Sequence, residues 1–367
     1  MAGQRLLSLD VMRGLTVIGM IVVNGAAIYS GWGERPVYGT LLHADWHGTT
    51  LADLVFPFFI FIVGMSIPFA LSSVKEKTGL TLELARRIIW RGTLLFIIGL
   101  GLTFYFYDLD GEKLFRLLGV LQRIGLVFIG AALIFMVTSL RVQVGLVAAI
   151  LLLYWPLMFL PFPDGVVDLS EPGQNFVQWF DRAVLGGRVF AASAPFPYEP
   201  EGLISTLPAI AQALLGVLLG QWVKGKGGHL PIGQLLIGGM VLAALGWAWS
   251  FSFPLNKNLW SSSFVLWTSG LAILLFALLY YLLDVKSWGF AWAKPCQAFG
   301  INSIAGYVLH TLITGWVWLS PLGEELYTYA LGFMSPEMAL LLPVGMNVVV
   351  TWAPVAVLQH RKIIIKV

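Results

Sequence analysis

Long runs of apolar residues recur along this chain of 367 residues and are separated by shorter polar stretches. A helix needs about 20 apolar residues to cross the hydrocarbon core of a bilayer. Ten segments reach or approach that length, and the pattern therefore predicts an all-α, polytopic membrane bundle of about ten transmembrane helices. The segments cover residues 11–30, 49–73, 87–107, 116–138, 142–160, 203–223, 231–251, 260–284, 296–319 and 336–359.

Two details of the pattern bear on the number of spans. The apolar piece at residues 288–292 adds an eleventh, re-entrant segment if it enters the membrane. The first run has the length of a signal peptide, but its small residues, Gly25, Ala26 and Ala27, lack the A-x-A spacing of a cleavage site. We therefore expect the first span to be retained. Because no internal repeat is visible, we expect one transmembrane domain over residues 1–367.

The longest segment between two spans covers residues 161–202. Within it, Phe176, Trp179, Phe180 and Val184 recur at helical spacing, with polar residues between them. This pattern is typical of an amphipathic helix that lies on a membrane surface. A lid that packs on the helical bundle would show the same pattern, so both arrangements stay open.

Composition supports a membrane protein. Hydrophobic residues make up 58% of the chain and charged residues only 11%, whereas soluble domains carry roughly a quarter charged residues. A water-soluble globule could not bury so much apolar surface. The chain has one cysteine, Cys296, so it can form neither an intramolecular disulfide nor a cysteine-based metal cluster.

Lysine and arginine are unevenly distributed among the predicted loops. If the amino terminus is cytoplasmic and ten spans alternate, the basic clusters at residues 75–77, 86–91 and 361–366 all face the cytoplasm. An excess of lysine and arginine marks cytoplasmic loops, so we expect both termini in the cytoplasm and residues 161–202 outside. The outer side receives only Arg35, Lys113, Arg116, Arg182, Arg188 and Lys257.

Two histidines and two acids lie close together at the predicted outer mouth of the second span. Histidine exchanges a proton near neutral pH, and a neighbouring carboxylate fixes its tautomer. His43 and Asp53 are therefore candidate catalytic residues. Two other interpretations stay open. Thr50 and Asp53 have the spacing of a capping box that only begins a helix, and His43, Asp45 and His47 could bind a metal, although their spacing supports this weakly.

Polar side chains inside apolar spans are costly in lipid and are functional candidates. Asn24 lies in the outer half of the first span, and Gln122 and Arg123 lie in the fourth. Arg123 needs a partner or a water-filled cavity there, and its guanidinium could hold a phosphate or carboxylate with two hydrogen bonds. The alternatives are a helix–helix hydrogen bond for Asn24 and, for Arg123, a side chain that extends to the membrane surface.

Two further polar stretches enter spans eight and nine. The first holds Asn258, Trp260, Ser261 and Ser262. In the second, Asn302 is followed by a polar helix face that ends at His310. A polar face inside a bundle predicts a pocket or a pore, and interhelical hydrogen bonds are the alternative.

These motifs together resemble the heparan-α-glucosaminide N-acetyltransferase family, a group of multi-span acyltransferases with bacterial members. The resemblance begins at residues 5–14 (RLLSLDVMRG) and continues at residues 43–57 (HADWHGTTLADLVFP). It covers nearly the whole chain, and its amino-terminal motifs are the specific ones. The supporting motifs are residues 119–123 (GVLQR), 199–203 (EPEGL), 256–261 (NKNLWS) and 300–303 (GINS).

The resemblance implies transfer of an acetyl group from acetyl-CoA to the terminal glucosamine amine of a glycan across the membrane. His43 looks like the family's active-site histidine, Asn24 like its nearby asparagine and Asp53 like its carboxylate. In the mechanism that we expect, His43 is the general base or briefly carries the acetyl group, and Asp53 orients it. Asn24 donates a hydrogen bond to the developing oxyanion.

Acetyl-CoA is expected as acyl donor, with no metal. We expect a polar passage surrounded by spans one, two, four, eight and nine, with the CoA nucleotide at the cytoplasmic rim near Arg86, Arg87 and Arg91. The residues expected to contact CoA or the sugar are Gln122, Arg123, Asn258, Trp260, Ser261, Ser262, Asn302 and His310.

A transporter or flippase is the alternative function, in which Asp53, Arg123 and His310 would line a substrate or proton path. Transporters often contain paired repeats, and their absence from this sequence favours the acyltransferase. The expected partners are acetyl-CoA, an amino-sugar or glycan acceptor and the lipid of a bacterial inner membrane. A homodimer is compatible with the sequence, and nucleic acid is not expected as a partner.

Overall fold

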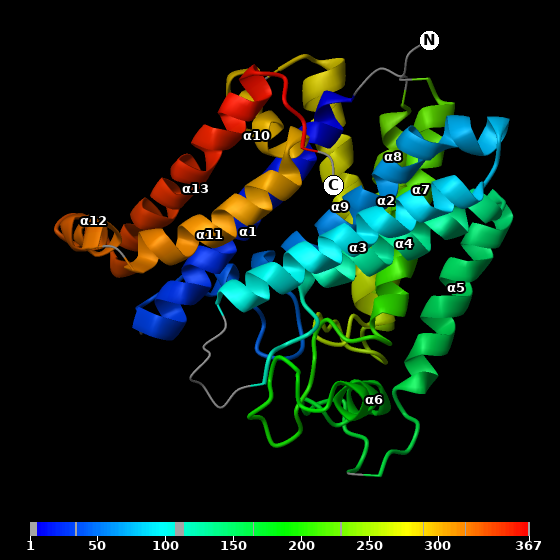
Figure 1. Ribbon diagram of the computed structural model, residues 1–367, viewed down its shortest axis with the longest axis horizontal. Coiled ribbons are helices and arrows are strands. Elements are labelled where there is room, and N and C mark those ends of the chain that lie inside the picture. The colour runs from blue at the N-terminus through cyan, green and yellow to red at the C-terminus, as the bar shows by residue number, and fades with distance from the viewer. Residues whose placement is uncertain are drawn as a thin grey trace.

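Nine helices of the described chain are long and apolar enough to cross a membrane. The computed structural model describes residues 6–33, 35–106, 114–163, 165–227, 230–288, 290–319 and 321–365 (Figure 1). The prediction of an all-α, polytopic membrane protein is confirmed. The nine helices are α1 (Leu7–Gly33), α2 (Leu51–Lys77), α3 (Leu82–Tyr105), α4 (Val120–Val137), α5 (Leu140–Leu157), α7 (Thr206–Gly225), α8 (Ile232–Trp249), α9 (Ser262–Leu279) and α13 (Pro336–His360).

The ninth predicted span is divided into two helices. They are α10 (Phe290–Ile301) and α11 (Ser303–Leu319), and together they lead the chain from one end of the bundle toward the other (Figure 1). Asn302 lies between them, where its Nδ2 donates to the Ile363 carbonyl (3.1 Å) and its Oδ1 accepts from the Ile365 N–H (2.9 Å). The apolar piece considered as an eleventh span contributes Trp292 to α10. Before it, α9 continues as the π-helix η2 (Tyr280–Val285).

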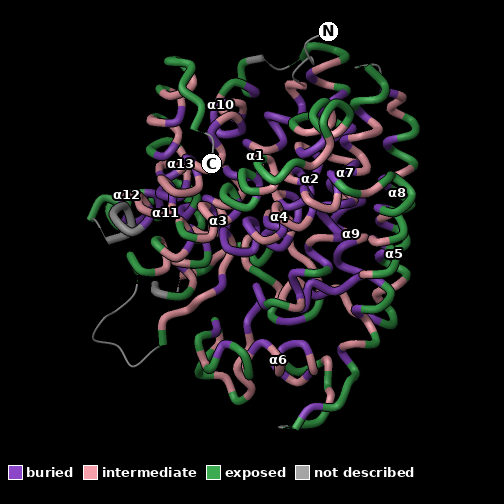
Figure 2. Tube along the Cα trace, turned by 45° about the vertical axis from the view of Figure 1, so that its right-hand side comes forward, coloured by how far each residue is buried: buried purple, intermediate pink, exposed green. Residues whose placement is uncertain are grey.

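The helices differ in how far they are buried (Figure 2). Four helices form the centre of the bundle, because more than half of the residues in the most apolar stretch of each are buried. They are α2, α4, α7 and α9. In α3, α5 and α8 the buried share is 22%. Apolar side chains that face outward this extensively are stable only against lipid, so these three helices form the membrane-facing periphery.

Small residues allow the central helices α2 and α7 to approach closely. A Cβ atom at Gly64 of α2 would lie 1.9 Å from the Ala213 carbonyl oxygen. A Cβ atom at Gly216 of α7 would lie 2.1 Å from the Phe61 carbonyl oxygen. Backbones in contact through small residues are a common way for membrane helices to pack, and here this contact fixes the position of α2, which begins at the candidate site.

Both ends of the described chain lie toward one end of the bundle, and helix α6 (Phe176–Leu185) lies at the opposite end (Figure 1). This arrangement agrees with an even number of crossings. Two more short helices lie outside the nine: η1 (Gly39–Leu41), which follows α1, and α12 (Pro321–Leu331), which packs against α11 and α13.

Helix α6 buries one face against the protein around it, as expected for a lid, one of the two arrangements that its sequence predicts. Its buried residues include Gln178 and Asp181, which are 1% and 0% exposed. Val184, by contrast, is 54% exposed. The inward face is therefore mixed, with the apolar Val177 and Leu185 beside these two polar side chains. Gln178 Oε1 accepts hydrogen bonds from the Gly173 N–H (2.8 Å) and from Asn175 Nδ2 (2.9 Å), so this burial leaves that oxygen paired.

Candidate active site

His43 and Asp53 lie against each other in the loop between α1 and α2 and at the first turn of α2. His43 Nδ1 is 2.8 Å from Asp53 Oδ1. The other carboxylate oxygen, Oδ2, accepts hydrogen bonds from the backbone N–H groups of Ala44 (3.0 Å) and Thr50 (3.1 Å). Thr50 and Asp53 also form the capping box of α2. Asp53 thus caps the helix with one oxygen and holds the imidazole with the other.

This contact determines the tautomer of His43. The buried Asp53 carboxylate accepts a hydrogen bond, so Nδ1 carries the proton and Nε2 keeps its lone pair. An imidazole in this state can take a proton at Nε2, while the carboxylate stabilises the resulting cation. The pair therefore has the geometry of a general base with its orienting acid.

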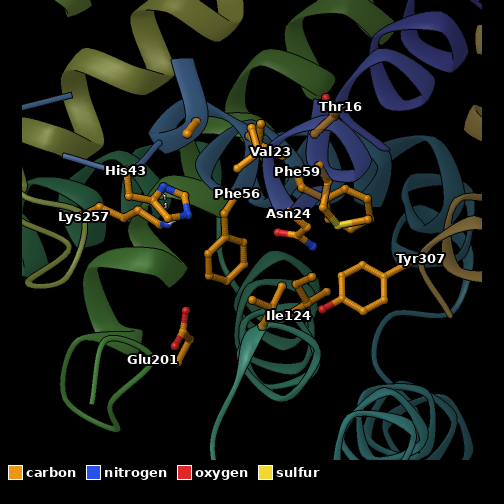
Figure 3. A pocket seen from close by; sticks show the side chains of 14 residues that line it. Thr16, Val23, Asn24, His43, Phe56, Phe59, Ile124, Glu201, Lys257 and Tyr307 are labelled. Atoms are coloured by element: carbon orange, nitrogen blue, oxygen red, sulfur yellow. Dashed lines mark hydrogen bonds between the residues drawn. The ribbon is translucent and has the colours of Figure 1, made fainter. Parts of the chain in front are cut away.

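A partly buried lysine joins the pair from a distant segment. Lys257, in the loop between α8 and α9, places its Nζ 3.0 Å from His43 Nε2 and 3.1 Å from Nδ1 (Figure 3). The same atom is 3.8 Å from Asp53 Oδ1. Burial lowers the pKa of the Lys257 ammonium, and the charges of Asp53 and Glu201 oppose that shift.

Asn24 approaches from α1 and is held by a polar chain behind it. Its Nδ2 lies 3.0 Å from His310 Nε2, and His310 Nδ1 lies 2.9 Å from Thr314 Oγ1. Thr314 Oγ1 also accepts a hydrogen bond from Asn347 Nδ2 (3.0 Å). Because the nitrogen of Asn24 is directed to His310, its oxygen lies on the side of Phe56 (Figure 3).

An ionic cluster lies beside the site. Arg116 binds both Glu199 and Glu201. Burial raises the pKa of Glu199 to about 7, against the effect of Arg116. Burial also acts to raise the pKa of Glu201, but the charges of Arg116 and Arg123 outweigh it, so this pKa is lowered. Glu201 therefore brings a negative charge to the site.

These side chains surround a cavity of about 90 Å³ (Figure 3). Its lining comes from α1, α2, α4 and α11, which are four of the five spans expected around a passage, and from the loops that carry His43, Glu201 and Lys257. We call it the outer cavity. Its lining residues are Thr16, Met20, Val23, Asn24, His43, Ala52, Val55, Phe56, Phe59, Val120, Ile124, Glu201, Lys257 and Tyr307.

A second, larger cavity of about 390 Å³ lies nearer the end of the bundle at which α2 ends and α3 begins. Arg13, Arg87 and Arg91 line it, and we call it the basic cavity. Phe59 and Ile124 line both cavities, so the two meet at these side chains. Of the three arginines expected at the cytoplasmic rim, Arg87 and Arg91 line this cavity and Arg86 does not.

The predicted binding residues of α4 are buried against protein groups. Arg123 donates to Ser205 Oγ and to the Gly202 carbonyl (3.2 Å), and its guanidinium carbon lies 5.0 Å from the centre of the Trp260 ring. Gln122 Nε2 donates to a backbone carbonyl at 3.4 Å. Neither residue lines the outer or the basic cavity.

The predicted residues at the start of α9 shape a loop. Ser261 Oγ donates to the Pro254 carbonyl (2.8 Å) and Ser262 Oγ to the Leu151 carbonyl (2.7 Å). The Trp260 indole N–H donates to Gln212 Oε1 (2.9 Å). Asn258 is half-buried in the same loop.

Sequence reasoning missed three residues of the outer cavity as site members, namely Glu201, Lys257 and Tyr307. Glu201 and Lys257 lie in motifs that carry the family resemblance, and Tyr307 lies on the polar face of the ninth span. The signal was therefore present as charge or polarity beside a span. Their convergence on His43 depends on tertiary contacts that spacing along the chain does not reveal.

The metal interpretation finds no support in the geometry of the histidine loop. His47 Nδ1 lies 3.2 Å from Asn256 Nδ2, whereas His43 contacts Asp53. In the part of the chain that the structure describes, no three His, Cys, Asp or Glu side chains are grouped so that they could hold a metal ion.

Comparison with known proteins identifies the family. Residues 5–246 match the family model described as heparan-alpha-glucosaminide N-acetyltransferase, catalytic, and this match covers more than half of the chain. The chain belongs to the heparan-alpha-glucosaminide N-acetyltransferase family. The resemblance seen in the sequence is confirmed. The matched residues include Asn24, His43, Asp53 and Glu201, whereas Lys257 lies beyond them.

Two curated relatives, each named heparan-alpha-glucosaminide N-acetyltransferase, are similar to most of this chain. The Homo sapiens protein is 30% identical over 359 residues, which cover 83% of this chain and 52% of the relative. The Mus musculus protein is 30% identical over 366 residues, which cover 85% and 54%. The chain spans about half the length of the curated relatives that it matches.

Proposed function

We propose that this chain is a membrane-embedded acyltransferase that moves an acetyl group from acetyl-CoA to the amine of a terminal glucosamine or a related cell-envelope amino sugar. One observation carries the proposal. The outer cavity beside His43 and the basic cavity meet at Phe59 and Ile124. A donor from one end of the bundle and an acceptor from the other can therefore approach the same imidazole.

The basic cavity supports acetyl-CoA as the donor. Arg13, Arg87 and Arg91 line it, and guanidinium groups bind phosphates with parallel hydrogen bonds. Its volume of about 390 Å³ lies within the range of small-molecule sites, about 300–1,000 Å³. Pantetheine is slender enough to extend from there past Phe59 and Ile124 toward His43.

The charge distribution supports an orientation for this pathway. The end of the bundle that holds the basic cavity also carries the lysine and arginine clusters of the chain. By the positive-inside rule we assign this end, with both termini, to the cytoplasm of a bacterial cell, where CoA is made. The outer cavity then opens on the far side of the inner membrane.

The chemistry follows from the His43–Asp53 pair. The neutral amine of the acceptor attacks the thioester carbonyl carbon, a C–N bond forms, and an electron pair moves to the carbonyl oxygen. His43 Nε2 takes the proton of the amine, while Asp53 stabilises the imidazolium. The intermediate then collapses, the C–S bond breaks, and the sulfur leaves with the proton from Nε2. The products are an N-acetyl sugar and CoA with a free thiol.

Asn24 orients the acceptor in this proposal. Its Nδ2 is directed to His310, so Oδ1 is the atom available to the cavity (Figure 3). An amide oxygen accepts hydrogen bonds, and here it accepts one N–H of the amine and directs the nitrogen lone pair at the carbonyl carbon. This role differs from the oxyanion contact that the sequence suggested for Asn24.

An amino-sugar acceptor is supported by the acidic edge of the outer cavity. Glu201 lines the cavity, and a carboxylate attracts the ammonium form of an amine before it loses its proton. The printed name of the two relatives specifies a glucosaminide, which motivates glucosamine as the first acceptor to examine.

Thiol release tests the proposal. Purified protein carrying Cys296→Ser, which removes its own thiol, is incubated with acetyl-CoA and with glucosamine or a glucosamine disaccharide. Free CoA thiol and N-acetyl product are measured together. We expect equal amounts of both, and their loss in a folded His43→Ala variant. No product from any of these acceptors, or undiminished product from His43→Ala, would contradict the proposal.

A further inference from the structure

The attack on a thioester creates a negative charge on the carbonyl oxygen, and some group in the outer cavity must stabilise it. The polar residues of the lining are Thr16, Asn24, His43, Glu201, Lys257 and Tyr307. Thr16 Oγ1 already donates to the Met12 carbonyl (2.8 Å), and Glu201 brings a second negative charge. Asn24 directs its nitrogen to His310. Few donors therefore remain for an oxyanion.

We propose that Lys257 is a further catalytic residue, whose ammonium group holds the thioester carbonyl oxygen and the oxyanion formed from it. This inference rests on the acyltransferase function proposed above. Among the described residues that line the outer cavity, Lys257 is the only lysine or arginine. Its Nζ lies 3.0 Å from His43 Nε2, so the oxyanion contact and the proton acceptor are neighbours.

The ammonium group of Lys257 has more N–H donors than partners in the structure. It has three N–H groups, and His43 offers one lone pair, because its Nδ1–H is held by Asp53. Asp53 Oδ1, at 3.8 Å, is too distant for a hydrogen bond with Nζ. When the carbonyl oxygen of the donor enters, it replaces the imidazole as partner of Lys257. Nε2 is thereby released to accept the proton of the attacking amine.

The loop around Lys257 is built to hold it in place. The Gly48 N–H donates to the Leu255 carbonyl (2.8 Å), and Asn256 Nδ2 lies 3.2 Å from His47 Nδ1. The segment before Lys257 is thus bonded directly to the loop of His43. Trp260 adopts the left-handed conformation (φ +51°), which is costly for a bulky residue. Its buried indole, bonded to Gln212, keeps this turn in place.

Tyr307 is the competing donor, because it points its hydroxyl group into the cavity. It does so from the side of Ile124, across the cavity from His43, whereas Lys257 lies beside His43 (Figure 3). The C–N bond forms next to the nitrogen that takes the proton. Lys257 is therefore the better placed of the two for the oxyanion.

An infrared measurement separates this role from a structural one. The probe is a ¹³C-labelled ketone analogue of acetyl-CoA in which a methylene group replaces the sulfur, so its carbonyl is bound but cannot be cleaved. We expect binding to wild-type protein to shift the carbonyl stretch to lower frequency. Lys257→Met should lose that shift, with Lys257→Gln as the substitute if the Met variant does not fold. Asn24→Ala and Tyr307→Phe should keep it.

Kinetics give the second readout. Removing one oxyanion donor typically lowers kcat about 10²–10³-fold, so we expect Lys257→Met to lower kcat by this factor, with a much smaller rise in the KM for acetyl-CoA from the lost carbonyl contact. Lys257→Arg should recover part of the loss. A carbonyl shift that persists in folded Lys257→Met would overturn the role of Lys257 and leave the acyltransferase standing. A ketone analogue that fails to bind wild-type protein would overturn both.

Discussion

Asp53 combines a structural and a chemical role in one carboxylate. Its Oδ2 accepts the backbone N–H groups that begin α2, and its Oδ1 faces His43 Nδ1. The sequence presented these roles as alternatives, because a capping box and a histidine–carboxylate pair can share the same acidic residue. The structure shows that both contacts form at once. Helix α2 therefore fixes the imidazole directly.

Asp53→Asn should reduce acetyl transfer severely while leaving the cap in place. The Asn oxygen can accept the backbone N–H groups, but its amide then donates toward Nδ1 and favours the wrong tautomer of His43. In a serine protease triad the equivalent change lowers kcat about 10⁴-fold, and we expect a loss of roughly 10³–10⁴-fold here. Turnover and thermal unfolding are measured on the same preparation.

Asp45→Asn is the matched control for that change. Asp45 lies in the same loop, its side chain is exposed, and the substitution is chemically identical. Its turnover should stay close to that of the wild type. If Asp53→Asn also turned over at the wild-type rate in a folded protein, Asp53 would be a helix cap without a part in catalysis.

For individual residues, the sequence predicts the site well where the side chains that act together are close neighbours along the chain. His43 and Asp53 are ten residues apart and were recognised together. Lys257 is 214 residues from His43, and only the folded bundle brings them into contact. Ser261 and Ser262 were polar in the expected place, but their hydroxyl groups donate to backbone carbonyls. Polarity beside a span therefore does not distinguish a ligand contact from a loop anchor.

In helix α6, too, the sequence pattern alone did not predict which contacts the residues make. The spacing of its apolar residues predicted an amphipathic helix, but not which face would be buried. The buried face carries Gln178 and Asp181 beside the apolar Val177 and Leu185. One oxygen of each polar side chain has a partner: Gln178 Oε1 accepts from Asn175 Nδ2, and Asp181 Oδ1 accepts the Leu203 N–H at 2.8 Å. Partners of this kind come from the surrounding loops, which an analysis of helical periodicity does not include.

Asp181→Asn should stabilise the protein at alkaline pH. Burial raises the pKa of Asp181 to about 6, above the usual 3.8. The folded state then binds more protons, so the stability due to this group is complete below about pH 3.8 and is lost as the pH rises through about 6. At about 1.36 kcal/mol per pKa unit, the difference is at most about 3 kcal/mol.

Thermal unfolding in detergent measures this effect. The variant should melt above the wild type at pH 8, and the difference should shrink as the pH falls through about 6 and vanish below about 3.8. Glu171→Gln, an exposed change in the same outer segment, serves as control and should keep the pH profile of the wild type. An Asp181→Asn profile parallel to that of the wild type would show that this carboxylate does not govern the pH dependence.

Hydropathy could not predict the break between α10 and α11. Residues 296–319 are apolar on average, and an average of hydropathy does not register a change of helix direction. The sequence predicts a CoA or sugar contact at Asn302, and in the structure its amide binds the Ile363 carbonyl and the Ile365 N–H of the carboxy-terminal segment. An asparagine at a helix break can satisfy the backbone groups of a second segment, and this accounts for a polar residue there without a ligand.

For the whole molecule, the donor pathway predicts an asymmetry between neighbouring arginines of α3. Arg91→Ala should raise the KM for acetyl-CoA by about 10–100-fold, the equivalent of one charged hydrogen bond of about 1.5–3 kcal/mol. It should leave kcat unchanged, because a phosphate contact is the same in the ground state and the transition state. Arg86→Ala, exposed and outside the lining of the basic cavity, should change neither. Equal effects of the two substitutions would exclude a phosphate site in this cavity.

The orientation in the membrane predicts a labelling pattern. In a Cys296→Ser background, Val166→Cys on the outer segment should react with an impermeant maleimide in intact cells, since Val166 is 78% exposed. Lys77→Cys, exposed at the other end of α2, should react only after the membrane is permeabilised. The reverse pattern would place residues 161–202 in the cytoplasm and invert the proposed pathway.

The contact between the two cavities has an electrical consequence. A continuous column of water through the bundle would conduct ions, and each elementary charge that crossed would dissipate about 2.3 kcal/mol per 100 mV of membrane potential. Phe59 and Ile124, where the cavities meet, present only carbon to an ion that would have to shed its hydration shell. This hydrocarbon septum acts as an insulator, so the acetyl transfer that we propose between two compartments would not short-circuit the membrane that separates them.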